Sequence, residues 1–202
     1  STGGDSGEGM ADENQKHTFE VSDNPTVDVK GFNGWIEVVA GEDGTVDVEA
    51  KLTIPSRVSY SAVIEGNTVT VVAKQTGSGI TIGRSPKAEI RVVVPARSTI
   101  MARTSNGAVE VTGVLGDGEL ETSNGRITLT DVDGQFTANT SNGMVEMEGV
   151  AGQFQAGTTN GKIEFAGSFA TGSDNYLRTS NGTIDLTLEG DPDVEVDART
   201  SN

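Results

Sequence analysis

A short phrase, Thr-Ser-Asn-Gly or its variant Thr-Thr-Asn-Gly, recurs five times between residues 104 and 182 of this 202-residue chain. A sixth copy begins at Thr200. Successive copies are 18 residues apart for three intervals and 21 for the last two, as read from Asn106, Asn124, Asn142, Asn160, Asn181 and Asn202. Repeats of fixed length are typical of proteins in which one structural unit stacks on its copies. This feature restricts the fold more than any other in the sequence.

Apolar residues occupy the same positions around each copy. Counting the Thr of the phrase as position one, positions six and eight hold Val109 and Val111, Ile127 and Leu129, Val145 and Met147, Ile163 and Phe165, and Ile184 and Leu186. Two residues before the Thr stand Ala102, Leu120, Ala138, Ala156, Leu177 and Ala198. Alternate residues of a strand point to the same face. Each repeat is therefore predicted to be a strand, an Asn-Gly corner and a second strand.

Two all-β architectures fit this unit. An up-and-down β-meander would place Asn-Gly in a two-residue hairpin turn, where both central residues have positive φ. A single-domain β-solenoid, a β-helix-like stack of coils with about 18–21 residues each, would place identical positions above one another in parallel strands. The solenoid is favoured because it explains why Thr and Ser recur before the corner and why the interval is constant. Its handedness is left open.

Stacked coils would bring each repeated side chain beside its own copies. A ladder of side-chain amides is then expected at the corner, as in cross-β stacks, from Asn106, Asn124, Asn142, Asn160 and Asn181. The repeated threonines are expected to hydrogen-bond to their copies in the same way, and they are Thr104, Thr122, Thr140, Thr158 and Thr179. Both rows are structural predictions and locate no ligand.

The whole chain after a polar, flexible leader at residues 1–18 is predicted to form one β-repeat domain, residues 19–202. The segment VDVKGFNGWIEV matches the strand-corner-strand template, so residues 26–50 are interpreted as a first coil-like unit. Between residues 51 and 97 the phrase is lost, although strand-like runs divided by Gly and Pro remain. This region is predicted to contain divergent coils or a cap. Residues 98–202 are predicted to form the regular coils.

The charge of the chain argues against some classes of partner. Thirty acidic residues against 14 basic ones give a net charge of −16, which repels phosphate backbones and disfavours a nucleic-acid partner. No apolar run reaches the roughly 20 residues that a membrane-spanning helix needs, so no transmembrane segment is predicted. The chain has no cysteine, which excludes disulfides and thiolate metal sites. No cofactor is expected.

Few residues suggest catalysis. His17 is the only histidine; it precedes the first predicted strand, and no serine-containing elbow motif accompanies it. The outward position between the two core residues after each corner holds Glu110, Glu146, Glu164 and Asp185. Paired carboxylates can perform acid–base chemistry, but a solvated strand face explains these residues more simply. The sequence predicts no catalytic residue and no enzyme activity.

The two longer repeats offer a candidate ligand site. Their three extra residues fall in the segments FATGSDNYL and LEGDPDVEV, away from the Asn-Gly corner. Insertions in repeat proteins project on one face, which is often the binding face. An exposed oxygen-rich patch, suited to a divalent cation or to sugar hydroxyls, is predicted from Asp174, Asn175, Tyr176, Asp191 and Asp193. Neither segment matches an EF-hand loop, and no metal ligands are assigned.

The segment EIRVVVPARSTIMARTSNGAVEVTGV, followed by ETSNGRITLTDVDGQF and its successors, resembles the putative-adhesin family. Members are β-strand-repeat domains of unknown function in bacterial and archaeal cell envelopes. The likeness is clear over residues 89–202 and weaker over residues 26–88. It implies a β-solenoid-like domain, extracellular or in the cell envelope, tethered through the N-terminal leader. It supplies no catalytic residues.

The expected function is that of a non-enzymatic structural or adhesive module at the cell surface. Its expected partner is a surface protein or a polysaccharide. The alternative is a carbohydrate-binding or carbohydrate-active β-helix protein. The inventory of catalytic groups, with one histidine and no cysteine, favours the first function.

Overall fold

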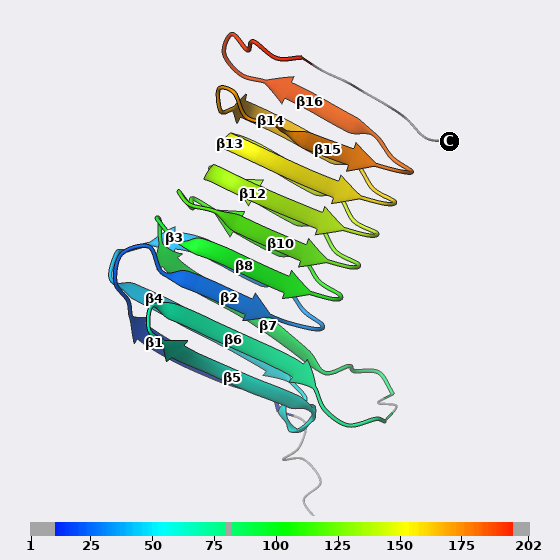
Figure 1. The fold of residues 1–202 in the computed structure, drawn as a ribbon. Helices are drawn as coiled ribbons and strands as arrows, with labels where there is room; N and C mark the ends of the chain where they lie inside the picture. Colours follow the sequence, from blue (N-terminus) through cyan, green and yellow to red (C-terminus); the bar gives the residue numbers. More distant parts are fainter. Residues whose placement is uncertain (1–10, 80–81, 196–202) are drawn as a thin grey trace, which may run out of the picture.

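The computed structural model describes residues 11–79 and 82–195. Within these ranges the chain forms sixteen strands, all hydrogen-bonded into one continuous sheet, and one turn of 3-10 helix, η1 (Pro55–Arg57). The strands are β1 (Glu13–Glu20), β2 (Thr26–Lys30), β3 (Ile36–Gly41), β4 (Thr45–Thr53), β5 (Val58–Glu65), β6 (Thr68–Gln75), β7 (Lys87–Pro95), β8 (Thr99–Thr104), β9 (Val109–Thr112), β10 (Gly118–Thr122), β11 (Ile127–Thr130), β12 (Asp133–Thr140), β13 (Val145–Thr158), β14 (Ile163–Phe169), β15 (Tyr176–Thr179) and β16 (Ile184–Leu188) (Figure 1). Within the described ranges, no helix is long and apolar enough to cross a membrane.

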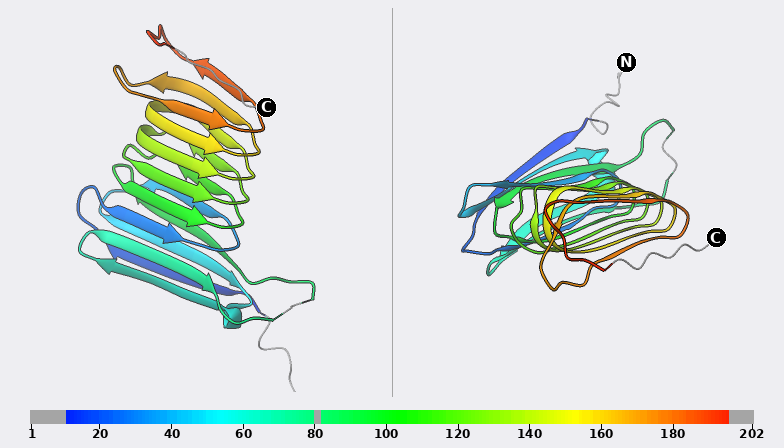
Figure 2. Two further views of the ribbon diagram at one scale, coloured as in Figure 1. Left: turned by 45° about the vertical axis from the view of Figure 1, so that its right-hand side comes forward. Right: turned by 90° about the horizontal axis from the view of Figure 1, so that it is seen from above.

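The sheet folds back on itself into two faces that enclose the core. The front face contains, in spatial order, β5, β6, β2, β8, β10, β12, residues 151–158 of β13, and β15. The back face contains β1, β4, β7, β3, β9, β11, residues 145–148 of β13, β14 and β16. Seen along the stack, the coils superpose as flattened rings (Figure 2). The predicted all-β, β-solenoid-like fold is confirmed.

Strands from successive repeats pair in parallel, and each residue meets its own counterpart. On the front face Leu120 lies between Ala102 and Ala138, its counterparts 18 residues before and after. On the back face Ile127 pairs in the same way with Val145. The register is kept between β13 and β15, where the interval is 21 residues. The alternative of a meander, in which the two strands of one repeat would pair with each other, is wrong.

Inward side chains of the two faces meet in one thin core. The positions predicted to point inward are buried from β8 to β14, and they form a single cluster with the buried residues of the earlier strands. Aromatic rings fill the part nearer the C-terminus. Phe136 and Phe154 stack at 6.2 Å, and Phe154 and Phe165 meet edge to face at 5.4 Å. Because adjacent coils share these contacts, each coil depends on the coils beside it.

The chain does not stack its coils in sequence order. β2 and β3 pair in parallel with β8 and β9, so the predicted unit at residues 26–50 joins the stack next to the first regular repeat (Figure 1). Its last part differs from the prediction, because β4 turns back and pairs antiparallel with β7. β6 and β7 add a divergent coil parallel to β2 and β3. The antiparallel strands β1, β4 and β5 end the stack as a cap. Residues 51–97 therefore contribute both to a divergent coil and to the cap.

The predicted leader at residues 1–18 is too long. Residues 1–10 lie outside the described part of the chain, but Glu13–Glu20 form β1 at the edge of the cap. His17 is therefore part of a strand, paired with Val48, and its ring stacks with Phe19 and Tyr60 at 6.1 and 5.9 Å. The segment ENQKHTFE alternates exposed and half-buried residues without apolar periodicity, which hides the strand in the sequence. The sixth copy of the repeat, including Ala198 and Asn202, also lies outside the described residues.

A row of asparagine side chains connects the corners. The Nδ2 of each donates to the Oδ1 of the asparagine in the neighbouring coil at 2.8–2.9 Å, in the order Asn181, Asn160, Asn142, Asn124, Asn106 and Asn33. Their backbone N–H groups follow the same direction, as where Asn124 donates to the carbonyl of Ser105 at 3.0 Å. The predicted asparagine ladder is confirmed, and Asn33 extends it into the first coil-like unit.

The repeated threonines do not bond to one another as predicted. The Oγ1 of Thr122 donates instead to the carbonyl oxygen of Gly107, the corner glycine of the adjacent coil, at 2.9 Å. The same contact joins Thr104 to Gly34, Thr140 to Gly125, Thr158 to Gly143, and Thr179 to Gly161. The buried hydroxyls are thereby satisfied, and the threonines attach one corner to the next through the backbone.

The corner glycines are required by this close approach. A Cβ on Gly143 would lie 1.7 Å from the carbonyl oxygen of Gly125, and the corresponding distance is 1.8–1.9 Å at the other repeated corners. Among the described corner glycines only Gly34 has a positive φ, of 115°. The hairpin-turn explanation of Asn-Gly therefore does not apply to the repeated copies. Glycine is needed because the backbone of one corner occupies the space of a side chain on the next.

Replacing Gly143 by alanine should destabilise the protein by about 2–3 kcal/mol, because the corner must open to admit a methyl group. The matched control is Gly79→Ala, where an added Cβ meets nothing closer than 3.5 Å and the change should stay within about 0.5 kcal/mol. Denaturant unfolding of both variants measures the difference. Equal unfolding midpoints would contradict the stacked corner.

The cap predicts a pH dependence of stability. Burial raises the pKa of the Tyr60 hydroxyl from 10.0 to about 12, so the folded protein keeps a proton that the unfolded chain has lost. The free energy of unfolding should therefore fall as the pH rises from about 10 to about 12. Tyr60→Phe should remove this part of the fall. Unfolding midpoints at about pH 8 and about pH 11 measure it, and identical pH profiles of the variant and the original chain would contradict it.

Candidate functional site

Outward positions of the front face form three columns that cross the strands. Counted back from the Thr of each repeat, they lie one, three and five residues upstream, and we name them column one, column three and column five. Column one contains Arg103, Glu121, Asn139, Gly157 and Arg178. Column three contains Met101, Glu119, Thr137, Gln155 and Tyr176. Column five contains Thr99, Asp117, Gln135, Gln153 and Asp174. Since strands in a sheet lie about 4.8 Å apart, each column is a regular row.

An open hollow of about 310 Å³ lies over columns three and five. Its outward side chains come from β8, β12 and β13, two from each, and from Glu119 on β10 and Asp117 just before it; they are Thr99, Met101, Asp117, Glu119, Gln135, Thr137, Gln153 and Gln155. All of these except Met101 carry an amide, a hydroxyl or a carboxylate. The four strands are neighbours on the face seen in Figure 1. Seven of these eight residues therefore lie on hydrogen-bonded strands, and Asp117 lies directly before one.

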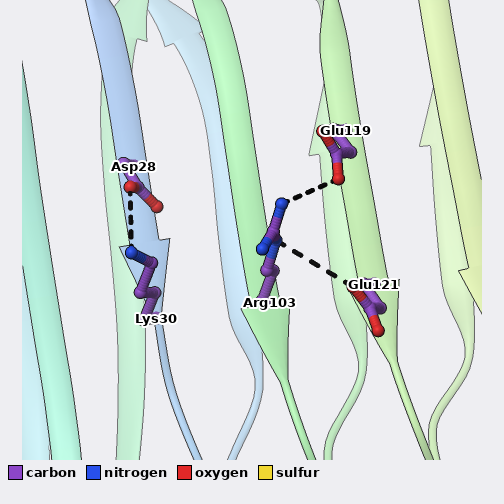
Figure 3. Close-up of polar contacts among 5 residues, drawn as sticks. All are labelled: Asp28, Lys30, Arg103, Glu119 and Glu121. Atoms are coloured by element: carbon purple, nitrogen blue, oxygen red, sulfur yellow. Dashed lines mark hydrogen bonds and ion pairs between the residues drawn. The ribbon is translucent and has the colours of Figure 1, made fainter.

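Charged residues of β2, β8 and β10 form ion pairs on the front face beside the hollow, and Figure 3 shows their side chains. Nη2 of Arg103 donates to Oε1 of Glu119 at 2.7 Å, and Nε of Arg103 lies 4.0 Å from Oε2 of Glu121. On β2, Nζ of Lys30 lies 3.3 Å from Oδ2 of Asp28. Ion pairs this accessible to water contribute about 1 kcal/mol or less to stability. The bond from Arg103 holds the Glu119 carboxylate at the border of the hollow.

Several polar groups of the hollow are available to a ligand. Asp117 accepts a hydrogen bond from the backbone N–H of Gln135 at 3.0 Å, and Nε2 of Gln153 donates to the carbonyl of Asp174 at 3.0 Å. These two bonds hold the side chains of Asp117 and Gln153 in place. The side chains of Gln135, Thr137 and Gln155, by contrast, make no hydrogen bond within the described part of the chain. They can donate to a ligand and accept from it.

The predicted patch in the longer repeats is only partly a surface site. Asn175 is used by the fold: its Oδ1 accepts from the backbone N–H of Phe154 at 2.8 Å, and its Nδ2 donates to Oγ of Ser173 at 2.9 Å. Tyr176 is 59% exposed and continues column three beyond Gln155. Asp174 continues column five, so these two residues extend the hollow's columns.

Asp191 and Asp193 lie after β16, on an exposed segment without strand structure. No group of three or more His, Cys, Asp or Glu side chains in the described ranges is arranged to hold a metal ion. The predicted oxygen-rich patch is thus not assembled as a cation site among those residues. Asp174 and Tyr176 remain candidate sugar-binding residues, because both lie on the front face.

The repeated carboxylates predicted on the other strand lie on the back face. Glu146 pairs in register with Glu164, and Glu164 with Asp185. Lys162 contacts both Glu164 and Asp185, and its hydrogen bonds, first with Asp185 and then with Glu164, raise its pKa. Arg126 lies 3.6 Å from Glu146. The arrangement is a solvated, ion-paired strand face, as the sequence suggested.

Sequence reasoning overlooked the main residues of the hollow. Asp117, Gln135, Thr137 and Gln155 differ from coil to coil, so no shared phrase marks them. A signal was nevertheless present, because they fall at fixed offsets from the repeated Thr, between the inward positions. Reading the outward offsets as columns across the stack would have located the surface.

Residues 26–189 match the model of a family described as Toastrack DUF4097, and no curated protein matches the chain. A solved structure described as a putative adhesin, from Bacteroides fragilis NCTC 9343, shares 12% identity at a TM-score of 0.42, covering 86% of this chain and 96% of its own. A putative cell adhesion protein from Clostridium sporogenes ATCC 15579 shares 12% at a TM-score of 0.39, covering 88% and 100%. A putative lipid binding protein from Parabacteroides distasonis ATCC 8503 shares 10% at a TM-score of 0.27, covering 86% and 96%.

Calcium should not stabilise this protein, because the acidic residues of the longer repeats are not gathered into a ligand set. We expect the melting temperature in 5 mM calcium chloride to equal that in EDTA within about 1 °C, since only a ligand that binds the folded state raises it. Differential scanning fluorimetry measures the shift. A rise of several degrees that Asp174→Asn abolishes would contradict this assignment.

Proposed function

The chain belongs to the Toastrack DUF4097 family, and we propose that it acts as a non-enzymatic β-repeat module that binds a partner at the cell surface. The observation that supports this most is the set of three outward columns on the front face. They present polar side chains at regular spacing over many adjacent strands. Binding a large partner requires such an extended surface, whereas catalysis requires a few converging groups.

The rigidity of the front face supports a binding role. Each strand from β6 to β13 on this face is paired on both edges, and the corners beside it are fixed by the asparagine ladder. Side chains on such strands need little reorganisation when they meet a partner, which favours affinity. The stack therefore acts as a scaffold whose surface chemistry can vary from coil to coil.

The chemistry of the hollow favours binding over catalysis. Asp117 and Glu119 are its two carboxylates, and both are exposed, with Glu119 ion-paired to Arg103. A carboxyl group that acts as general acid is instead placed in an apolar environment. His17 lies in the back-face cap, paired with β4. The alternative, a carbohydrate-active β-helix enzyme, therefore lacks an identified acid–base pair among the described residues.

The cap suggests an orientation at the surface. We propose that the protein is extracellular or in the cell envelope and that the residues before β1 tether it. β1 belongs to the cap, at the opposite end of the stack from β16 (Figure 1). A tether there would extend the regular coils away from the cell, with the front face exposed along the side of the stack.

Antibody labelling of intact source cells tests the proposed location. We expect labelling without permeabilisation, and loss of the signal after brief protease treatment of intact cells. Labelling only after permeabilisation would contradict a surface module. A cytoplasmic protein of the same cells provides the control for intactness.

A turnover assay tests the non-enzymatic part of the proposal. The purified chain should release no product from neutral or acidic polysaccharides. Hydrolysis that Asp117→Asn or Glu119→Gln abolishes, and that the back-face control Glu110→Gln leaves intact, would establish the carbohydrate-active alternative instead.

A further inference from the structure

We propose that columns three and five of the front face form a binding site for an uncharged oligosaccharide chain, with Tyr176 as its aromatic platform. This inference rests on the proposed function, because it names the ligand class of the same face. The hollow over β8, β10, β12 and β13 holds part of the chain, and the neighbouring strand β15 extends the site to Tyr176.

The unoccupied hydrogen-bonding groups match sugar hydroxyls. Gln135, Thr137 and Gln155 line the hollow and make no side-chain hydrogen bond within the described residues. An amide side chain presents a donor and an acceptor in one plane, and a hydroxyl can act as either. Sugar hydroxyls also donate and accept, so two adjacent hydroxyls can satisfy one amide. A ligand with only acceptors, such as a phosphate, would leave half of these groups unused.

Tyr176 adds the apolar contact that sugar recognition needs. It is 59% exposed, and it lies in register beside Gln155, one strand beyond the hollow. The face of an aromatic ring carries negative charge density and attracts the polarised C–H groups on the flat side of a sugar ring. The phenol hydroxyl can reach water or a further sugar hydroxyl. The amides can therefore hydrogen-bond to the sugar hydroxyls, and the exposed ring beside them can stack on the flat side of a sugar ring.

Charge restricts the ligand to uncharged sugars. Asp117 and Glu119 both line the hollow, and the nearby cation Arg103 is already engaged by Glu119 and Glu121. The chain as a whole carries a net charge of −16. Uronic acid polymers and phosphate-containing polymers would be repelled. The carboxylates can still accept hydrogen bonds from neutral sugar hydroxyls.

A protein partner fits the hollow less well. Stable protein interfaces have a core of aromatic or aliphatic anchors surrounded by polar groups. Here Met101 is the one outward apolar side chain among the eight that line the hollow. The pattern is a polar floor with an aromatic ring at one end, which suits a chain of sugar rings.

The geometry also predicts the direction of the bound chain. Columns three and five run across the strands, from β8 towards β15. An oligosaccharide that contacts successive members of a column must lie along the axis of the stack. Successive sugars would then meet equivalent positions on successive coils, which favours a linear polymer over a single sugar.

An NMR titration of the isotope-labelled chain tests the site. The uncharged probes are cellohexaose, chitohexaose and mannohexaose, and the acidic probe is hexagalacturonate. We expect at least one uncharged probe to shift the amide resonances of β10, β12, β13 and β15, and hexagalacturonate to shift none of them. Gln155→Ala and Tyr176→Ala should each weaken binding at least about tenfold.

Lys74→Ala is the control, because Lys74 is an exposed, outward residue of β6 on the same face but does not line the hollow. It should leave the affinity unchanged, and the spectra of all variants should retain the dispersion of a folded chain. Failure of every uncharged probe to bind, preference for hexagalacturonate, or binding that Gln155→Ala and Tyr176→Ala both leave intact would overturn the inference. The labelling of intact cells would still test the surface function independently.

Discussion

The contact between one corner backbone and the next determines the rest of this structure. At each repeated corner the carbonyl oxygen of one glycine lies against the corner glycine of the adjacent coil. A Cβ added to that second glycine would be only 1.7–1.9 Å from the oxygen. The neighbouring threonine donates to this same carbonyl, and the asparagine amides bond to each other beside it. Three residue types are therefore required together. This explains why the chain repeats a phrase and not only a pattern of apolar residues.

The alignment of the corners also fixes the pairing register of the strands on both faces of the sheet. A shift of one residue in a strand would exchange its buried and exposed sides, and the corners prevent that shift at every coil. Different apolar residues can then fill the same inward position, as Leu120 and Ala138 do in adjacent coils, while outward positions vary freely. The hollow over columns three and five is a consequence of this division. The scaffold is constant, and the ligand chemistry resides in the residues that the repeat does not specify.

The sequence predicted those parts of the fold that the repeat encodes directly. The strands, the corner and the parallel stacking could be predicted because the positions of Asn106 and Val109 recur at a fixed interval. The asparagine ladder followed from the stacking. The cap was less accessible, because β1 has no apolar periodicity and its partner β4 is defined only by a pairing distant in sequence. The order of the coils was not predictable either, since nothing local indicates that β2 lies between β6 and β8. The residues of the hollow were missed because Gln135 and Gln155 belong to no shared phrase.

Interstrand nuclear Overhauser effects between backbone protons test the central claim most directly. The account predicts contacts between Ile127 and both Val109 and Val145, its counterparts in the adjacent coils, with side-chain amide contacts from Asn124 to Asn106 and Asn142. Contacts between Leu120 and Leu129 in the pattern of an antiparallel hairpin, without those across 18 residues, would contradict it.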